Sequence, residues 1–159
     1  MALERFKSVR TLVIASYPEE DLTPVQGLTQ LEYLSVTHLP KVSDLAPLDA
    51  LSALRTLRLA TLPSWDSYGR VTSIRSLRPL AHMPALKHLE LFGVVPEDRS
   101  LSPLEGSGTL RSVRVSKYPG EEVQRFRNVT SIEDAWAPKP SIADWRVAVE
   151  RVDRARHGR

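Results

Sequence analysis

Residues 45–59 set the pattern of this chain and read Leu45-Ala46-Pro47-Leu48-Asp49-Ala50-Leu51-Ser52-Ala53-Leu54-Arg55-Thr56-Leu57-Arg58-Leu59. Leucines recur three positions apart from Leu45 to Leu57, and the last step, to Leu59, is two positions. A single amphipathic helix requires a mixture of three- and four-residue spacings, and a single strand requires alternation throughout. The change of spacing therefore predicts a compact bend, an extended connection and then a short strand over residues 57–59.

The same pattern recurs along most of the chain. A half repeat occupies residues 1–18, further repeats lie near 22–40, 45–63, 77–96 and 101–119, and a degenerate repeat covers 123–136. The equivalent strand residues are Leu12, Leu34, Leu57, Leu89, Val113 and Ile132, separated by 22, 23, 32, 24 and 19 residues. A lone repeat cannot bury its apolar face, so the repeats must stack. We therefore predict an α/β repeat solenoid, residues 1–136, with a parallel sheet of about six strands.

These repeats resemble leucine-rich repeats in their Leu-x-x-Leu-x-Leu core. The Asp-Leu-x-Pro-Leu opening at residues 44–48 resembles the short repeats of internalins and of phosphatase-regulatory leucine-rich proteins. The resemblance implies an arc with the sheet on its concave face and a role in binding other proteins. One position departs from the family, since the usual Asn after each strand is replaced by an apolar or aromatic residue followed by a proline. The replacing residues are Tyr17, Leu39, Leu62, Val94 and Tyr118.

The outward strand positions on the predicted concave face suggest a binding surface. The central column reads Val13, Ser35, Arg58, Glu90, Arg114 and Glu133. Its alternating charges either pair with one another across neighbouring strands, as a self-satisfied ladder, or form a mixed-charge surface that selects a partner. Tyr33, His88 and Phe92 are large side chains among small neighbours, although Phe92 can alternatively fold against Gly93 and the inserted loop. We predict a partner-binding surface made of Tyr33, Arg58, His88, Glu90, Phe92 and Arg114.

The 32-residue step contains an insertion at residues 60–73. It includes Trp65, Tyr68 and Arg70, and these three residue types are enriched at binding hot spots. Long loops in compact domains are commonly functional. We therefore add the insertion to the predicted binding surface, with the alternative that Trp65 only anchors the loop on the flank of the solenoid.

The C-terminal segment, residues 137–159, is predicted to form a capping helix and a basic tail. Ile142, Trp145, Val149 and Val152 have helical spacing, so we expect a helix over 142–155 that covers the last repeat together with Trp136. The arginines of residues 151–159 also allow an alternative function in association with nucleic acid, although a charged terminus is more commonly a solvated end. A third possibility is a structural subunit of a larger assembly.

Composition limits the remaining function classes. The chain has 159 residues, no cysteine and a formal charge of +3. It has no apolar run of signal-peptide or transmembrane length, so we expect a cytoplasmic protein. The compact size, the missing signal peptide and the high Arg, Ala and Leu content together suggest a bacterial origin. The four histidines have neither metal-ligand spacing nor a paired carboxylate pattern, so no catalytic residue, metal site or cofactor is predicted. The predicted function is a non-enzymatic protein-binding module, in its most specific form an immunity or antitoxin-like protein.

Overall fold

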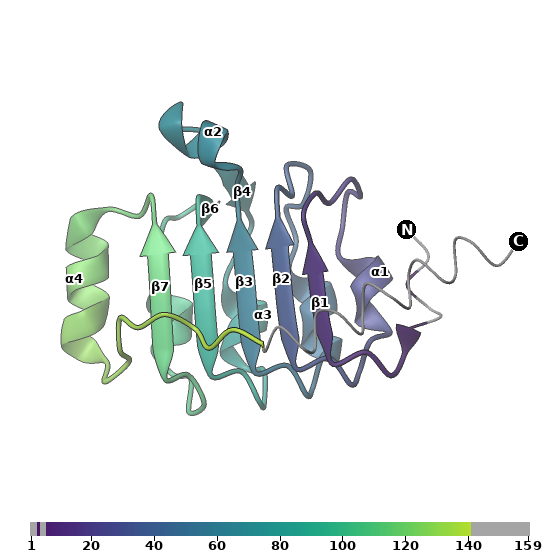
Figure 1. Ribbon diagram of the computed structural model, residues 1–159. Coiled ribbons are helices and arrows are strands. Elements are labelled where there is room, and N and C mark those ends of the chain that lie inside the picture. Colours follow the sequence, from purple (N-terminus) through teal and green to yellow (C-terminus); the bar gives the residue numbers. More distant parts are fainter. Residues whose placement is uncertain (1–2, 4–5, 141–159) are drawn as a thin grey trace, which may run out of the picture.

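The computed structural model describes residue 3 and residues 6–140, and its centre is a parallel sheet (Figure 1). The strands lie in the order β1-β2-β3-β5-β7. Their bounds are Thr11–Ile14 (β1), Tyr33–Thr37 (β2), Thr56–Ala60 (β3), His88–Phe92 (β5) and Ser112–Ser116 (β7). One strand comes from each successive repeat, as the spacing predicts.

The register of the sheet matches the predicted alignment of the repeats. Leu34 pairs with Leu12 on one side and with Leu57 on the other, and Leu57 pairs in turn with Leu89. Leu34, Leu57 and Leu89 have no exposed surface. The prediction that the strand leucines point inward into one continuous core is therefore confirmed.

The bend of each repeat is a short helical turn behind the sheet. These turns are α1 (Thr23–Gln26), η2 (Ala46–Ala50), α3 (Arg78–Ala81) and η3 (Ser102–Leu104). Each has a proline in its first two positions, where the missing N–H costs no helical hydrogen bond. Consecutive turns pack against one another, α1 on η2, η2 on α3 and α3 on η3, so the turns form the second layer of the solenoid.

Most of the residues that replace the family's Asn pack into or against the core. Tyr17, Leu39 and Val94 have no exposed surface. The hydroxyl of Tyr17 donates to the carbonyl oxygen of Asp21 at 2.7 Å, and the hydroxyl of Tyr118 donates to that of Val94 at 3.2 Å. Burial raises the pKa of Tyr17 to about 12 and also raises the pKa of Tyr118. Apolar packing and tyrosine hydroxyl groups therefore take the place of an Asn ladder at these turns.

The insertion is more ordered than a loop. It forms α2 (Pro63–Ser67) and β4 (Thr72–Ile74), and β4 pairs in parallel with β6 (Val94–Pro96) in a separate two-stranded sheet. Gly69 follows α2 with φ +68°, a left-handed conformation typical of helix C-termini. Helix α2 stands beyond the carboxyl ends of the main strands (Figure 1).

The degenerate repeat, residues 123–136, does not add a sixth strand. Its first part is α4 (Gly120–Val129), because Val123 and Phe126 are spaced for one face of a helix, and Phe126 is buried in the core. After α4, a single parallel bridge joins Glu133 to Ser112. The prediction of about six strands is therefore wrong by one in the main sheet.

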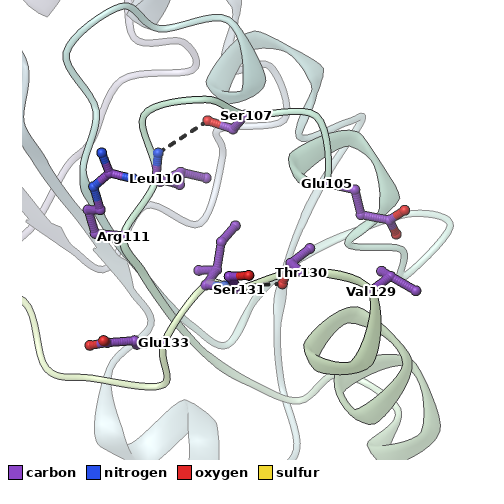
Figure 2. A pocket seen from close by; sticks show the side chains of 9 residues that line it. Glu105, Ser107, Leu110, Arg111, Val129, Thr130, Ser131 and Glu133 are labelled. Atoms are coloured by element: carbon purple, nitrogen blue, oxygen red, sulfur yellow. Dashed lines mark hydrogen bonds between the residues drawn. The ribbon is translucent and has the colours of Figure 1, made fainter.

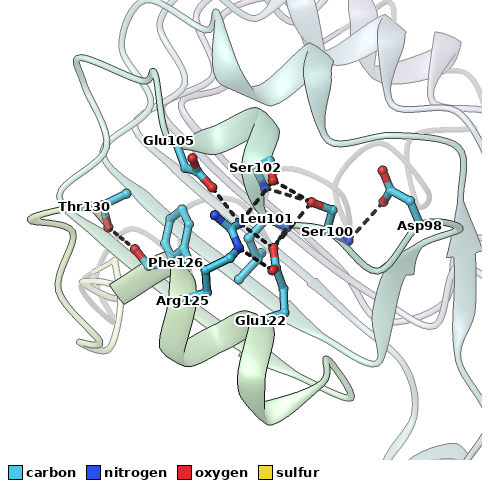
Figure 3. Close-up of polar contacts among 9 residues, drawn as sticks. All are labelled: Asp98, Ser100, Leu101, Ser102, Glu105, Glu122, Arg125, Phe126 and Thr130. Carbon is cyan, nitrogen blue, oxygen red and sulfur yellow. Dashed lines mark hydrogen bonds and ion pairs between the residues drawn. The ribbon is translucent and has the colours of Figure 1, made fainter. Parts of the chain in front are cut away.

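Helix α4 lies beside β7 at this end of the solenoid and is attached to the η3 turn by polar contacts (Figures 1 and 3). Glu122 accepts a hydrogen bond from the backbone N–H of Leu101 at 2.7 Å, and Arg125 donates to Glu122 at 2.7 and 2.8 Å. Arg125 also contacts Glu105 at 2.6 Å. Hydrogen bonds from Arg125 hold the pKa of Glu122 at about 2, against an ordinary 4.5. The predicted capping helix over 142–155 lies outside the described residues.

Candidate functional site

The face of the main sheet turned away from the helical turns, here called the open face, carries the residues predicted to bind a partner. Arg58 and Glu90 are cross-strand neighbours on this face and form an ion pair of 3.2 Å. The Glu90 side chain is only 5% exposed, whereas that of Arg58 is 33% exposed. A nearly buried carboxylate requires a partner of opposite charge. The Arg58–Glu90 pair therefore fits the alternative in which the charges of the central column pair with one another.

The acidic partner of Arg114 differs from the prediction. The sequence places Glu133 next to Arg114, but Glu133 bridges Ser112, two residues earlier on β7. Arg114 instead forms an ion pair of 3.3 Å with Asp134, which also contacts Arg127. The register changes here because the chain enters from α4 and not from a regular repeat.

Four side chains on the open face form a continuous row, here called the arginine–aromatic stack: Arg58, Phe92, Trp136 and Arg114. The Arg58 guanidinium carbon lies 5.6 Å from the centre of the Phe92 ring. Phe92 and Trp136 have ring centres 5.8 Å apart, and Arg114 lies 4.1 Å from the centre of the Trp136 ring. Trp136, expected in the C-terminal cap, lies on the open face and is 64% exposed.

Trp136 belongs to a stretch that crosses the open face, here called the crossing segment, residues 134–137. In Figure 1 the chain passes from α4 in front of β7 and β5 towards β3. Asp134 pairs with Arg114 at one end of the segment. At the other end, the backbone N–H of Ala137 donates to Glu90 at 2.8 Å. Three of the predicted binding residues, Glu90, Phe92 and Arg114, are therefore in contact with the crossing segment of the same chain.

Tyr33 and His88 lie at the amino-terminal ends of β2 and β5 and are both half-buried. The His88 Nδ1 atom lies 2.8 Å from the hydroxyl oxygen of Ser112. Burial, with a contribution from Lys87, lowers the pKa of His88, so the neutral ring is favoured. Burial also raises the pKa of Tyr33, and the charges of Arg58 and Glu90 act on it in opposite directions. These two side chains add a neutral, hydrogen-bonding region beside the stack.

The predicted residues of the insertion divide into an anchor and an exposed tip. The Trp65 ring packs edge-on against His38, with centres 5.0 Å apart and an angle of 84°. Arg70 lies 5.9 Å from the centre of the same Trp65 ring. Tyr68, in contrast, is 82% exposed. The contact with His38 fits the anchoring role for Trp65, and Tyr68 is an aromatic side chain of the insertion that faces solvent.

A cavity of about 350 Å³ lies between residues 105–111 and the end of α4 (Figure 2). Its lining is largely polar and includes Glu105, Arg111, Ser131 and Glu133. None of its lining residues is histidine or cysteine, and none belongs to the predicted binding surface. The cavity therefore lies apart from the predicted binding surface.

Metal-binding clusters and membrane-spanning helices are both absent from the part of the chain that the structure describes. Among these residues, no group of three or more His, Asp or Glu side chains is placed to hold a metal ion. No helix within this part is long and apolar enough to cross a bilayer. The arginine-rich residues 151–159, on which the nucleic-acid alternative depends, lie outside it.

Solved structures resemble this arrangement. An internalin (inlF) from Listeria monocytogenes str. 4b F2365 aligns with a TM-score of 0.55 over 82% of this chain and 42% of its own, at 18% identity. The chain has an internalin-like leucine-rich-repeat fold. Internalin C2 (inlC2) from the same strain aligns with a TM-score of 0.44 over 60% of this chain and 36% of its own, at 31% identity. The chain therefore matches less than half the length of either internalin, and no family model or curated protein matches it.

The crossing segment is the part of the open face that the sequence analysis does not predict. Residues 137–140 read Ala-Pro-Lys-Pro, and prolines at alternate positions indicate an extended chain. This signal predicts that the chain after α4 is extended. It does not predict which face of the sheet the extended chain crosses, because Ala137 and Glu90 are 47 residues apart.

Proposed function

We propose that this protein is a non-enzymatic binding module that holds another protein on its open face, with α2 as a second contact at the rim. The observation that carries the proposal is the part of the arginine–aromatic stack that belongs to the sheet, Arg58, Phe92 and Arg114, on a face that no helical turn covers. Arg is among the residue types most enriched at binding hot spots, and cation–aromatic pairs such as Arg58 with Phe92 add directional attraction. Tyr68, the exposed tip of the insertion, supplies a further amphipathic aromatic side chain.

The test compares capture of native partners by matched variants of the purified chain. The test variant is Arg58→Gln/Phe92→Ala, which removes one cation and one ring of the stack. Glutamine is preferred to glutamate at position 58 because a second carboxylate beside the nearly buried Glu90 would destabilise the fold. The control is Arg78→Gln/Val129→Ala, which also changes one Arg to Gln and one apolar side chain to Ala, at exposed positions of α3 and α4.

Extract from the source cells is passed over each immobilised protein, and retained proteins are quantified by mass spectrometry. We expect a protein retained by the wild type and by the control to lose roughly ten-fold or more in retention on the test variant, as for a hot-spot residue. Equal retention by the test variant and the control would exclude the open face as the binding surface. A Tyr68→Ala variant measures the contribution of the insertion in the same way.

In its more specific form, the proposal is that the partner is a toxin and that this chain is the immunity or antitoxin-like protein that covers it in the bacterial cytoplasm. A rigid solenoid with a preformed surface suits a single protein ligand, because little ordering is lost on binding. Co-expression of the chain with the product of a neighbouring toxic gene should restore growth, and the Arg58→Gln/Phe92→Ala variant should not. Growth that is unaffected by the wild-type chain contradicts this form and leaves the general binding role in place.

A further inference from the structure

The crossing segment lies on the open face in the manner of a bound peptide. It is held there by ion pairs, ring contacts and a backbone hydrogen bond. Asp134 pairs with Arg114 at 3.3 Å, and the Trp136 ring lies against Phe92 and under Arg114. The N–H of Ala137 donates to Glu90 at 2.8 Å. A carboxylate, an aromatic ring two residues later and a backbone N–H are thus all recognised by groups of the sheet.

The segment is attached to the surface and is not part of the core. Asp134 is 38% exposed and Trp136 is 64% exposed. The apolar core cluster, which contains Leu57, Leu59 and Leu91, does not include any residue of the segment. Of its four residues only Ala137 is buried. The segment can therefore leave the face while the stacked leucines keep their contacts.

The charges of the sheet also favour an acidic ligand. The central column of the open face places Glu90 between Arg58 and Arg114, so one carboxylate of the sheet stands beside two cations. Glu90 pairs with Arg58. Arg114 receives its carboxylate from Asp134, outside the sheet, and Arg127 of α4 contacts the same carboxylate. When the segment leaves, Arg114 and Arg127 lose this shared carboxylate.

We propose that the open face binds an extended partner segment with the pattern acidic residue, any residue, aromatic residue, small residue, and that the crossing segment occupies this site until the partner displaces it. This inference rests on the proposed binding function and adds to it the class of ligand and a means of regulation. A tethered segment competes at an effective concentration on the order of millimolar for a short linker. The wild-type chain therefore binds a free peptide of this pattern weakly, and loosening the crossing segment strengthens the binding.

The test uses the full chain and a fluorescent peptide with the sequence of residues 132–139, Ile-Glu-Asp-Ala-Trp-Ala-Pro-Lys. Binding is measured by fluorescence anisotropy, with a scrambled peptide as the control ligand. The Asp134→Asn/Trp136→Ala variant removes the side-chain contacts of the crossing segment and leaves the sheet unchanged. We expect it to bind the peptide roughly ten-fold or more tightly than the wild type does. Adding Arg114→Ala to this variant should abolish the gain.

A second variant, Ala137→Pro, removes the N–H that contacts Glu90 without changing either side chain that contacts the stack. It should also bind the peptide more tightly than the wild type, and it replaces the double variant if the latter does not fold. Equal peptide binding by the wild type and by a folded variant would overturn the proposal, because the segment would then be a fixed part of the surface. A wild-type dimer that dissociates on Asp134→Asn/Trp136→Ala substitution, measured by light scattering, would also overturn it in favour of exchange between two copies.

The two proposals can fail separately. If the native partner is lost on Arg58→Gln/Phe92→Ala substitution but is retained no better by Asp134→Asn/Trp136→Ala, the binding function stands and the displacement is wrong. If peptide binding tightens as expected but no native protein depends on Arg58 and Phe92, the site is a self-contact and the binding function is wrong.

Discussion

Gly93 joins β5 to β6, next to Phe92 of the arginine–aromatic stack, and replacing it with alanine should destabilise the protein strongly. Gly93 has φ +67°, and a Cβ atom there would lie 2.3 Å from the hydroxyl oxygen and 3.1 Å from the methyl carbon of Thr61. The left-handed conformation costs a residue with a Cβ atom about 1–2 kcal/mol, and overpacking adds about 1–3 kcal/mol. Thr61 is buried and β-branched, so it has little freedom to move. We expect a total loss of about 2–5 kcal/mol in the free energy of unfolding.

The assay is urea denaturation at neutral pH, followed by circular dichroism. The matched control is Gly106→Ala, because no atom lies within 4 Å of a Cβ atom built at Gly106 and its φ is not positive. Removing a glycine at such a position restricts the unfolded chain and changes stability by about +0.4 to +1 kcal/mol. The two substitutions are therefore expected to have opposite signs.

A third variant separates the cost of the left-handed backbone at Gly93 from the cost of the clash with Thr61. In Gly93→Ala/Thr61→Ala the atoms that clash are absent, so the double variant should lose less stability than the sum of the two single variants. The left-handed backbone cost should remain. The reasoning is refuted if Gly93→Ala and Gly106→Ala unfold at the same urea concentration, since the close approach to Thr61 would then have no energetic consequence.

Three further predictions concern the core, a turn and the α4 attachment. Leu57→Ala should cost about 2–5 kcal/mol of unfolding free energy, because Leu57 has no exposed surface; an unchanged melting temperature would contradict its inward position. Tyr17→Phe should cost about 1 kcal/mol in urea denaturation through loss of the hydrogen bond to Asp21. Glu122→Gln should cost about 1.5–3 kcal/mol at pH 7, through weaker hydrogen bonds from Leu101 and Arg125. Because folding lowers the pKa of Glu122 from 4.5 to about 2, its contribution is complete above pH 4.5 and is lost as the pH falls towards 2. The stability difference between wild type and Glu122→Gln should shrink over that pH range, and a difference independent of pH would refute the assignment.

The predicted site shows which contacts can be predicted from a local sequence pattern. The strand residues Arg58 and Glu90 come together because each follows an inward leucine in its own repeat, and the repeats stack in register. The spacing of the leucines is enough to predict this contact. The insertion was recognised from its length, but its helix and its pairing with β6 were not, because five helical residues and three strand residues carry too little periodicity.

The end of the repeat series shows the opposite case. Val123 and Phe126 are three residues apart, which fits both a decayed repeat and one face of a helix. The contacts of Glu122 with Leu101 and of Arg125 with Glu105 join α4 to the η3 turn across about twenty residues. Such long-range contacts produce no regular spacing in the sequence. The choice between a decayed repeat and a helix therefore depends on tertiary packing, which favours the helix.

The sequence by itself determined the solenoid, the register of the five described strands of the main sheet and the leucines of its core, because each of these follows from a short-range repeat that every neighbouring copy reinforces. Only the tertiary structure decided what lies on the open face. Trp136 reaches Phe92 and Arg114, and Ala137 reaches Glu90, through single contacts between distant parts of the chain. A contact that occurs once has no period, and its energy depends on a surface that exists only after the repeats have stacked.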